Sequence, residues 1–414
     1  MGFKQERGAS DHTKQEGCAS GVRESIRKAT VSFFANLLTR PRHIGTPKEV
    51  HHERHIRSID QLRGVAILAV IVFHLSHYFV YPAWFTPHMF VYLPWLRNGW
   101  MGVNLFFILS GFVLYWPYAR EHRSMHGMAS ASEFLRHRAK RLLPLYYLST
   151  AILFAIQVRD LDAAATQMQA VTLLTATFNF FPTTFFPRPN WVLWSLGVEI
   201  WFSILFPLLV VGVASFGFPR VAIFVFTIAL LVRIAGTYVT AVQIPGQLLN
   251  PLRDSVLGRL DDFFVGMLIA AWYTKARVGW QPRRATCFLL LLLGVTISTC
   301  APVLWELSAS GRLVPKGLIA IANNVFQAGI ALVLVALLGT QRGRRSIISY
   351  PLELMGMMCF SLYIWHGVVM QSMVKELSFA GVAAYAIALS IVAGLSYRYV
   401  EFGRTKTWQQ LLPN

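Results

Sequence analysis

Charged residues are scarce in this sequence, and acidic ones are the scarcest. Only 14% of the 414 residues are charged and 55% are hydrophobic, whereas soluble globular proteins carry about a quarter charged residues. The 19 Asp and Glu residues face 38 Lys and Arg residues, which gives a formal net charge of +19. This composition argues against a soluble fold. It also argues against a nucleic-acid-binding protein, whose basic groups sit on a domain that folds in water.

Cysteine is rare as well. The four cysteines, Cys18, Cys287, Cys300 and Cys359, are scattered and form no CxxC pair, so neither a disulfide framework nor redox chemistry is expected. The first 60 residues have no apolar run of the kind found in a cleaved signal peptide. We therefore expect the first hydrophobic span to stay in the protein as a membrane anchor.

Long apolar runs make up most of the remaining chain. Ten of them have roughly the 17 to 25 residues that a helix needs to cross a bilayer. They lie at 62–81, 100–118, 143–158, 192–215, 219–239, 260–274, 285–303, 317–339, 350–372 and 378–399. An eleventh, weaker run at 168–186 contains Asn179 and Pro182 and is followed directly by Pro187, so hydrophobicity does not settle whether it crosses.

The basic residues between the spans decide the count. With ten spans and a cytoplasmic amino terminus, the clusters at 119–142, 275–284 and 340–349 all face the cytoplasm, as the positive-inside rule requires. The sequence thus predicts an all-α, polytopic membrane helix bundle of about ten transmembrane helices with both termini cytoplasmic. The predicted divisions are a largely disordered tail at 1–58, a membrane domain at 59–403 and a cytoplasmic tail at 404–414.

Ionisable residues inside apolar spans are costly and are functional candidates by default. Arg63 and His74 lie 11 residues apart in the first span, which places them on one helical face about 16.5 Å apart. An imidazole in apolar surroundings can act as a base near neutral pH, and an arginine at the interface can bind phosphate. The alternative for His74 is a hydrogen bond to a neighbouring helix without chemistry.

Glu199, in NWVLWSLGVEIWF, lies at a depth comparable with His74. A carboxylate beside the imidazole would fix its tautomer and stabilise the imidazolium, so Glu199 is a candidate partner of His74. The alternatives are a protonated glutamic acid or an ion pair with Arg233.

Further candidates lie toward the outer side and at the cytoplasmic face. Arg259 and Asp262 could bind a hydroxylated acceptor, although an Arg–Asp pair at a helix end is a close alternative. We also count His366 and Trp194 as candidate acceptor-binding residues; for His366 alone, packing is favoured over chemistry. Arg138 and Arg141 occupy neighbouring helical positions in FLRHRAKRLLPLYY, a spacing that suits a phosphorylated nucleotide. Ordinary positive-inside charge is the alternative.

No metal site is predicted. The segment HHERH at 51–55 lacks the HExxH order, because His52 occupies the position of the glutamate.

Five sequence elements together resemble acyltransferase family 3, the bacterial integral-membrane O-acyltransferases that modify surface polysaccharides, nodulation factors and macrolides. They are the Arg63-x10-His74 helix, GWMGVNLFFILSGF from Gly99, the RxxR-x-x-P element at Arg138, WSLGVE from Trp194 and SLYIWH from Ser361. The resemblance covers about residues 58–403. The sequence departs from the family pattern at Asn104, where aspartate is common, and at Gly197, where serine is usual.

The resemblance implies an enzyme that takes an acyl group, most often acetyl, from acyl-CoA at the cytoplasmic side. It implies that His74 is catalytic and that Arg63, Arg138 and Arg141 are needed for donor binding. The expected acceptor is a hydroxyl of a sugar in a surface polysaccharide or glycolipid precursor, and the expected location is the bacterial inner membrane. Acyl-CoA would be a co-substrate, with no permanently bound cofactor.

Other functions also fit these residues. A macrolide-like acceptor is one of them. A transporter of an anionic solute could use the same buried His, Arg and Glu side chains as a relay. A catalytically inactive subunit of a polysaccharide export machine is a further alternative.

Overall fold

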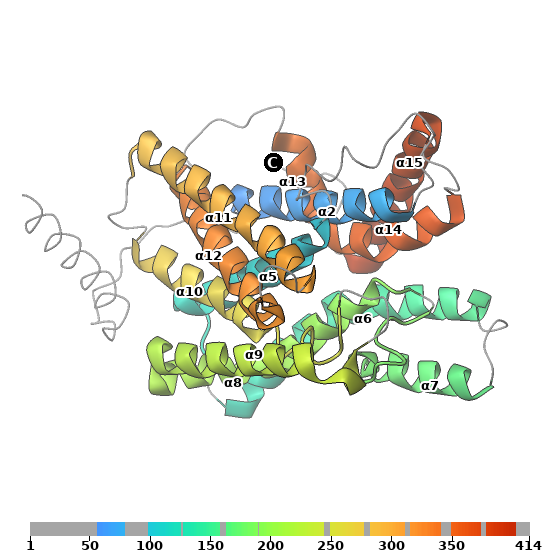
Figure 1. Cartoon of the computed structure of the whole chain (residues 1–414), viewed down its shortest axis with the longest axis horizontal. Helices are drawn as coiled ribbons and strands as arrows, with labels where there is room; N and C mark the ends of the chain where they lie inside the picture. The colour runs from blue at the N-terminus through green and yellow to red at the C-terminus, as the bar shows by residue number, and fades with distance from the viewer. Residues whose placement is uncertain are drawn as a thin grey trace, which may run out of the picture.

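The computed structural model describes residues 56–78, 98–125, 127–157, 163–188, 190–243, 249–276, 282–310, 315–340, 349–373 and 378–402, and these parts of the chain contain helices and no strand. The α-helices are α2 (Arg57–Tyr78), α5 (Gly102–Ala119), α6 (Gly127–Gln157), α7 (Ala163–Leu174), α8 (Leu193–Phe216), α9 (Phe218–Tyr238), α10 (Leu260–Ala276), α11 (Arg284–Ser310), α12 (Ile319–Gly339), α13 (Ser349–Met357), α14 (Cys359–Met373) and α15 (Phe379–Ser396) (Figure 1). Short 3-10 helices are η1 (Gly99–Met101), η3 (Phe178–Phe180), η4 (Thr240–Val242) and η5 (Lys316–Leu318), and a π-helical turn, η6 (Tyr397–Glu401), follows α15.

Nine of the ten predicted spans overlap one α-helix each, and the predicted span at 350–372 falls on two helices, α13 and α14. Within the described ranges, eight helices are long and apolar enough to cross a membrane. The pair α13–α14 is bent by 83° and forms a ninth span if it is counted as one. The remaining predicted span is α10, which has 17 residues. The weak run at 168–186 contains the end of α7, whose 12 residues are too few to cross a bilayer.

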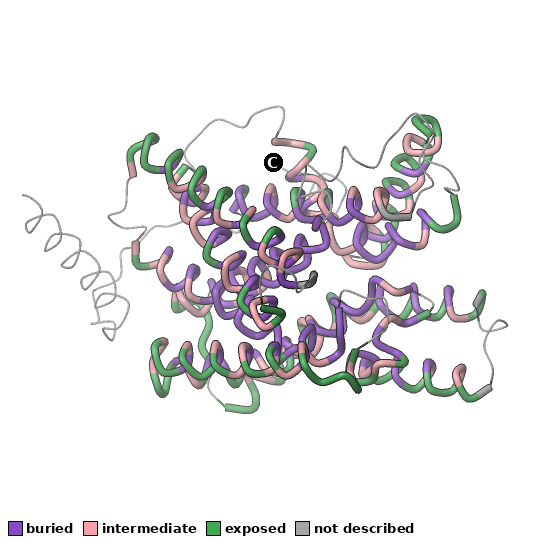
Figure 2. The backbone as a smooth tube through the Cα atoms, in the orientation of Figure 1, coloured by how far each residue is buried: buried purple, intermediate pink, exposed green. Residues whose placement is uncertain are grey.

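Large apolar side chains face outward on several helices. Figure 2 shows exposed positions along the outer sides of α8, α9, α11 and α15, and they include Leu208, Ile223, Phe288 and Ile387. In water such faces would be unstable, but against lipid tails they cost nothing. The distribution is that of a multi-pass membrane protein.

Helix α5 runs through the centre of the bundle (Figure 1) and packs on α10 at short range. Glycine makes this approach possible, because a Cβ atom at Gly111 would lie 1.9 Å from the Phe263 carbonyl oxygen and one at Gly266 would lie 1.9 Å from that of Ile108. Small residues at helix crossings let backbones meet closely inside membranes. The same device joins α2 to α13, where Gly64 and Gly356 face backbone carbonyl oxygens. This contact holds the part of α2 that carries Asp60 and Arg63.

Several predictions fall outside the described residues. They are the disordered tail up to residue 55, the HHERH segment, the cytoplasmic tail at 404–414 and most of the basic cluster at 340–349.

Candidate active site

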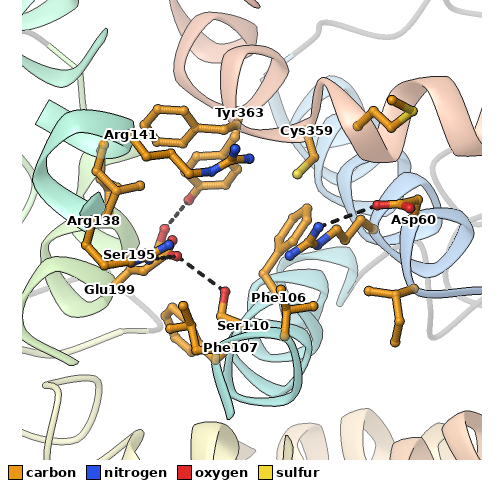
Figure 3. Close-up of a pocket in the computed structure, with 18 of the residues that line it drawn as sticks. Asp60, Phe106, Phe107, Ser110, Arg138, Arg141, Ser195, Glu199, Cys359 and Tyr363 are labelled. Carbon is orange, nitrogen blue, oxygen red and sulfur yellow. Dashed lines mark hydrogen bonds and ion pairs between the residues drawn. The ribbon is translucent and has the colours of Figure 1, made fainter. Parts of the chain in front are cut away.

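A cavity of about 530 Å³ opens between α2, α5, α6, α8 and α14 (Figure 3), a size typical of small-molecule sites. Its charged lining consists of four arginines and two carboxylates: Arg63, Arg123, Arg138, Arg141, Asp60 and Glu199. Aromatic side chains form much of the remaining wall: Phe106, Phe107, Trp116, Phe134, Phe360, Tyr363, Tyr397 and Phe402. The excess of arginine over carboxylate gives the cavity a net positive charge, which favours an anionic ligand.

Arg138 and Glu199 form the central ion pair of this cavity. Arg138 Nη2 lies 2.7 Å from Glu199 Oε1, and Arg138 Nε donates to Ser203 Oγ at 3.2 Å. Ser110 Oγ also donates to Glu199 Oε1, at 3.3 Å (Figure 3). The carboxylate therefore orients the guanidinium of Arg138 in the cavity wall.

The other two arginines predicted to bind the donor, Arg63 and Arg141, reach the same cavity from different helices. Arg63 Nη1 lies 3.5 Å from Asp60 Oδ1, one helical turn before it on α2. The guanidinium of Arg141 lies over the ring of Phe402, with 5.6 Å between its Cζ atom and the ring centroid. The three arginines predicted to bind the donor thus line one cavity. Their positions in the sequence alone did not determine that they would meet.

His74 lies in contact with His366. Its Nδ1 atom is 3.1 Å from His366 Nε2, and the edge of its ring meets Trp191 with 4.4 Å between centroids. His366 is completely buried, and its Nδ1 atom lies 2.6 Å from the Tyr363 carbonyl oxygen.

This arrangement differs from the predicted pairing of His74 with Glu199. In the structure Glu199 pairs with Arg138, and His74 contacts the imidazole of His366. The alternative partner of Glu199, Arg233, belongs to another cluster. Similar depth in the membrane was a poor guide, because depth says nothing about which way a side chain points around its helix axis.

Tyr363 connects the cavity to the histidine pair. Its side chain lines the cavity, and its carbonyl oxygen is the partner of His366 Nδ1. Its hydroxyl accepts from Ser195 Oγ at 2.7 Å (Figure 3) and donates to the Val192 carbonyl oxygen at 3.0 Å. Sequence reasoning named neither Tyr363 nor Ser195 as site residues, although both lie inside the motifs SLYIWH and WSLGVE.

Arg259 and Asp262 do not face an open vestibule. Arg259 is 2% exposed and donates to Asn323 Oδ1 at 3.0 Å, and it also pairs with Asp254. Asp262 is fully buried and accepts from Asn323 and Gln327 at 3.1 and 2.9 Å. Arg259 Nη1 lies 3.8 Å from Asp262 Oδ2, which matches the alternative of an Arg–Asp pair at a helix end; acceptor binding by these two residues stays a prediction.

A second buried pair extends this network. Arg233 and Asp261 share two hydrogen bonds of 2.8 Å, and Arg233 Nη2 also donates to Asn324 Oδ1 at 2.9 Å. Asn104, at the position where the resembled family often has aspartate, donates to Asn323 in the same network. The network therefore ties α5, α9, α10 and α12 together.

Trp194 is also a packing residue. It is 4% exposed and stacks on Phe185 with 5.9 Å between ring centroids. Its carbonyl oxygen accepts from Asn179 Nδ2 at 2.7 Å. A Cβ atom at Gly197 would lie 1.7 Å from Asn179 Oδ1, so the glycine that departs from the family pattern makes room for this amide.

Among the described residues, no group of three or more His, Cys, Asp or Glu side chains is arranged to hold a metal ion. The histidines of the segment at 51–55 lie outside those residues.

Comparison with protein families finds one match that covers most of the chain. The family model described as "Acyltransferase domain" matches residues 56–398. The match confirms the resemblance to the acyltransferase family that the five sequence elements carry.

Curated relatives carry acetyltransferase names. The chain is 24% identical over 374 residues to the "Putative O-acetyltransferase SACOL0978" of Staphylococcus aureus strain COL, which is 84% of this chain and 57% of that protein. It is 24% identical over 384 residues to the "Putative peptidoglycan O-acetyltransferase YrhL" of Bacillus subtilis strain 168, with 85% and 55% covered. It is 23% identical over 371 residues to the "Peptidoglycan O-acetyltransferase OatA" of Listeria monocytogenes, with 85% and 56% covered.

The chain spans just over half the length of these curated relatives. No solved structure matches it.

Proposed function

The chain belongs to the acyltransferase family whose model matches residues 56–398, and from that premise we propose that it is a membrane-embedded O-acyltransferase. The acyl group, an acetyl group in our proposal, comes from acyl-CoA. The acceptor is a hydroxyl of a sugar in a cell-envelope polysaccharide or its glycolipid precursor. Relatives named as peptidoglycan O-acetyltransferases support a sugar acceptor, with peptidoglycan the first to test.

The arginine-lined cavity is the observation that carries the proposal. CoA brings phosphate groups, and arginine binds phosphate through paired, charge-assisted hydrogen bonds. The cavity offers four arginines against two carboxylates, so a bound polyanion would complete its charge balance. Its aromatic walls suit the apolar parts of the donor.

The first transmembrane helix relates this cavity to the reacting atoms. Arg63 lines the cavity, and His74 lies 11 residues further along the same helix, about 16.5 Å away. That separation is close to the reach of an extended pantetheine arm. With its phosphates at Arg63, Arg138 and Arg141, acyl-CoA would present its thioester near the histidine pair.

We assign general-base catalysis to His74. Its imidazole takes the proton of the acceptor hydroxyl while the hydroxyl oxygen attacks the thioester carbonyl carbon. The carbon–sulfur bond then breaks, and the proton passes from the imidazolium to the leaving CoA sulfur. Transfer through an acyl-histidine would use the same residue as nucleophile. Glu199 contributes by holding Arg138 rather than by orienting His74.

The decisive experiment compares acetyl transfer by the wild type and by His74→Ala. Protein in nanodiscs is incubated with radiolabelled acetyl-CoA and a panel of glycan acceptors, and CoA release and label transfer are measured. We expect kcat to fall by at least about 10²-fold, the lower end of what a general base contributes, with acetyl-CoA binding nearly unchanged. His122→Ala is the matched control, because His122 is exposed and lies outside the cavity lining.

Two results would contradict the proposal. Normal kcat in folded His74→Ala protein would remove His74 from catalysis. Wild-type protein that binds acetyl-CoA but releases no CoA and labels no acceptor would favour a transporter of anionic solutes instead.

In the proposed orientation, the protein lies in the inner membrane of a bacterium. Its cavity opens toward the cytoplasm, and both termini are cytoplasmic. Basic residues between the spans support it through the positive-inside rule. Cysteine introduced in place of Arg284, at the start of α11, should react with a membrane-impermeant maleimide only after the membrane is opened. Labelling of this position in intact cells would reverse the orientation.

A further inference from the structure

His366 and its hydrogen bonds determine which nitrogen of His74 carries a proton. His366 Nδ1 lies 2.6 Å from the Tyr363 carbonyl oxygen. A carbonyl oxygen can only accept a hydrogen bond, so His366 Nδ1 must carry a hydrogen and donate it. A neutral imidazole has one such hydrogen, and a charge on this completely buried ring would be costly. His366 Nε2 is therefore an acceptor.

The acceptor role of His366 Nε2 determines the tautomer of His74. Its Nδ1 atom lies 3.1 Å from His366 Nε2, and because that atom accepts, His74 Nδ1 must donate. The single hydrogen of neutral His74 is then on Nδ1, and its Nε2 atom carries the lone pair. Nε2 is the nitrogen that can take a proton or attack a carbonyl carbon.

We infer that His366 is a positioning residue that holds His74 in the Nδ1–H tautomer. The Tyr363 carbonyl oxygen fixes His366 in turn, by accepting the hydrogen bond from its Nδ1 atom. This inference rests on the proposed acyl transfer by His74. It assigns to a second imidazole the task that a carboxylate performs in the known catalytic triads. His366 thus acts through His74 rather than on the acceptor, which differs from the acceptor-binding role that the sequence suggested.

The neighbourhood of the pair supports a fixed geometry. Trp191 meets the His74 ring at 4.4 Å and the His366 ring at 6.1 Å between centroids. Tyr385 donates to the His366 carbonyl oxygen at 3.3 Å, from α15. The ring of His366 is held by its Nδ1 hydrogen bond to the Tyr363 carbonyl oxygen and by the neighbouring Trp191 ring, with its Nε2 atom toward His74.

The test replaces His366 by side chains that keep or remove the acceptor. In His366→Gln the side-chain oxygen can accept from His74 Nδ1, whereas in His366→Phe nothing can. We expect kcat to stay within about tenfold of wild type in the first variant and to fall by about 10²-fold or more in the second. The KM for acetyl-CoA should be unchanged in both. Ser372→Ala is the control, because Ser372 lies on the same helix, α14, and is exposed; it should leave kcat unchanged.

A second measurement reads the tautomer without any turnover. Nitrogen NMR of ¹⁵N-histidine-labelled wild-type protein in nanodiscs, with the His74 signals identified by their loss in His74→Ala, should show hydrogen on Nδ1. Hydrogen on His74 Nε2, or equal loss of kcat in the Gln and Phe variants, would overturn the inference. A wild type that shows the Nδ1–H form but transfers no acetyl group would contradict the proposed function and leave the tautomer assignment standing.

Discussion

Two clusters of arginine and carboxylate lie within one helix bundle and differ in how completely their charges are matched. In the network of α9, α10 and α12, Arg233 and Asp261 are 1% and 0% exposed and meet through two hydrogen bonds. In the cavity, Arg138 and Glu199 are 13% and 23% exposed and meet through one. The first pair is closed to solvent and the second is open to a ligand.

The balance of charge follows the same division. The buried network sets three arginines, Arg233, Arg253 and Arg259, against three aspartates, Asp254, Asp261 and Asp262. The cavity lining sets four arginines against two carboxylates. A matched cluster holds helices together, because removing either partner leaves a buried charge. An unmatched cluster keeps positive charge available for a bound anion.

The largest expected effect comes from breaking the closed cluster. Asp261→Ala would leave Arg233 buried without its carboxylate, which costs about 3–5 kcal/mol of folding free energy for pairs of this kind. We expect a large fall in the thermal unfolding midpoint of the protein in detergent, or loss of folded protein.

Asp60→Ala is the matched control in the cavity. Its partner Arg63 is 21% exposed and 3.5 Å away, so water can reach the guanidinium after the substitution, and the loss of stability should be smaller than for Asp261→Ala. Equal destabilisation by the two substitutions would remove the distinction between the clusters.

A middle effect is expected from the open cluster, and it should appear in binding rather than stability. Arg138→Gln combined with Arg141→Gln removes charge-assisted hydrogen bonds to phosphate, each worth about 1.5–3 kcal/mol. Because every 1.4 kcal/mol is tenfold, the KM for acetyl-CoA should rise by about 100-fold or more, with the unfolding midpoint little changed. Steady-state kinetics with both substrates varied would measure it.

Arg136→Gln is the control for this double variant. Arg136 lies on the same helix but is exposed and does not line the cavity, so its KM should match that of the wild type. A parallel rise in the KM for the acceptor would mean that Arg138 and Arg141 serve folding or topology instead.

The smallest effect is expected from salt. Raising ionic strength from about 0.1 M to 1 M shortens the screening length from about 10 Å to 3 Å. In a cavity open to solvent, this should weaken the attraction between the arginines and the donor phosphates. We expect the KM for acetyl-CoA to rise by a few-fold in the wild type and by less in the Arg138→Gln, Arg141→Gln variant. An identical salt response in both proteins would show that these arginines do not attract the donor.

The apolar spans of this protein could be located from sequence alone, whereas the full length of α6 and the break between α13 and α14 could not. A segment that crosses a bilayer must satisfy its own backbone hydrogen bonds and present about 20 apolar residues to lipid, so each span leaves a readable apolar run. Spacing along one helix is equally readable. It placed Arg63 with His74, and Arg138 with Arg141, before any tertiary contact was known.

Only the tertiary structure decided the partners across helices. Glu199 pairs with Arg138 over a separation of 61 residues, and His74 meets His366 over 292. The apolar side chains of a membrane helix lie on all its faces, so their pattern does not report which face turns inward. Close approach at glycines sets that rotation, and through it the closed network, the open cavity and the histidine pair.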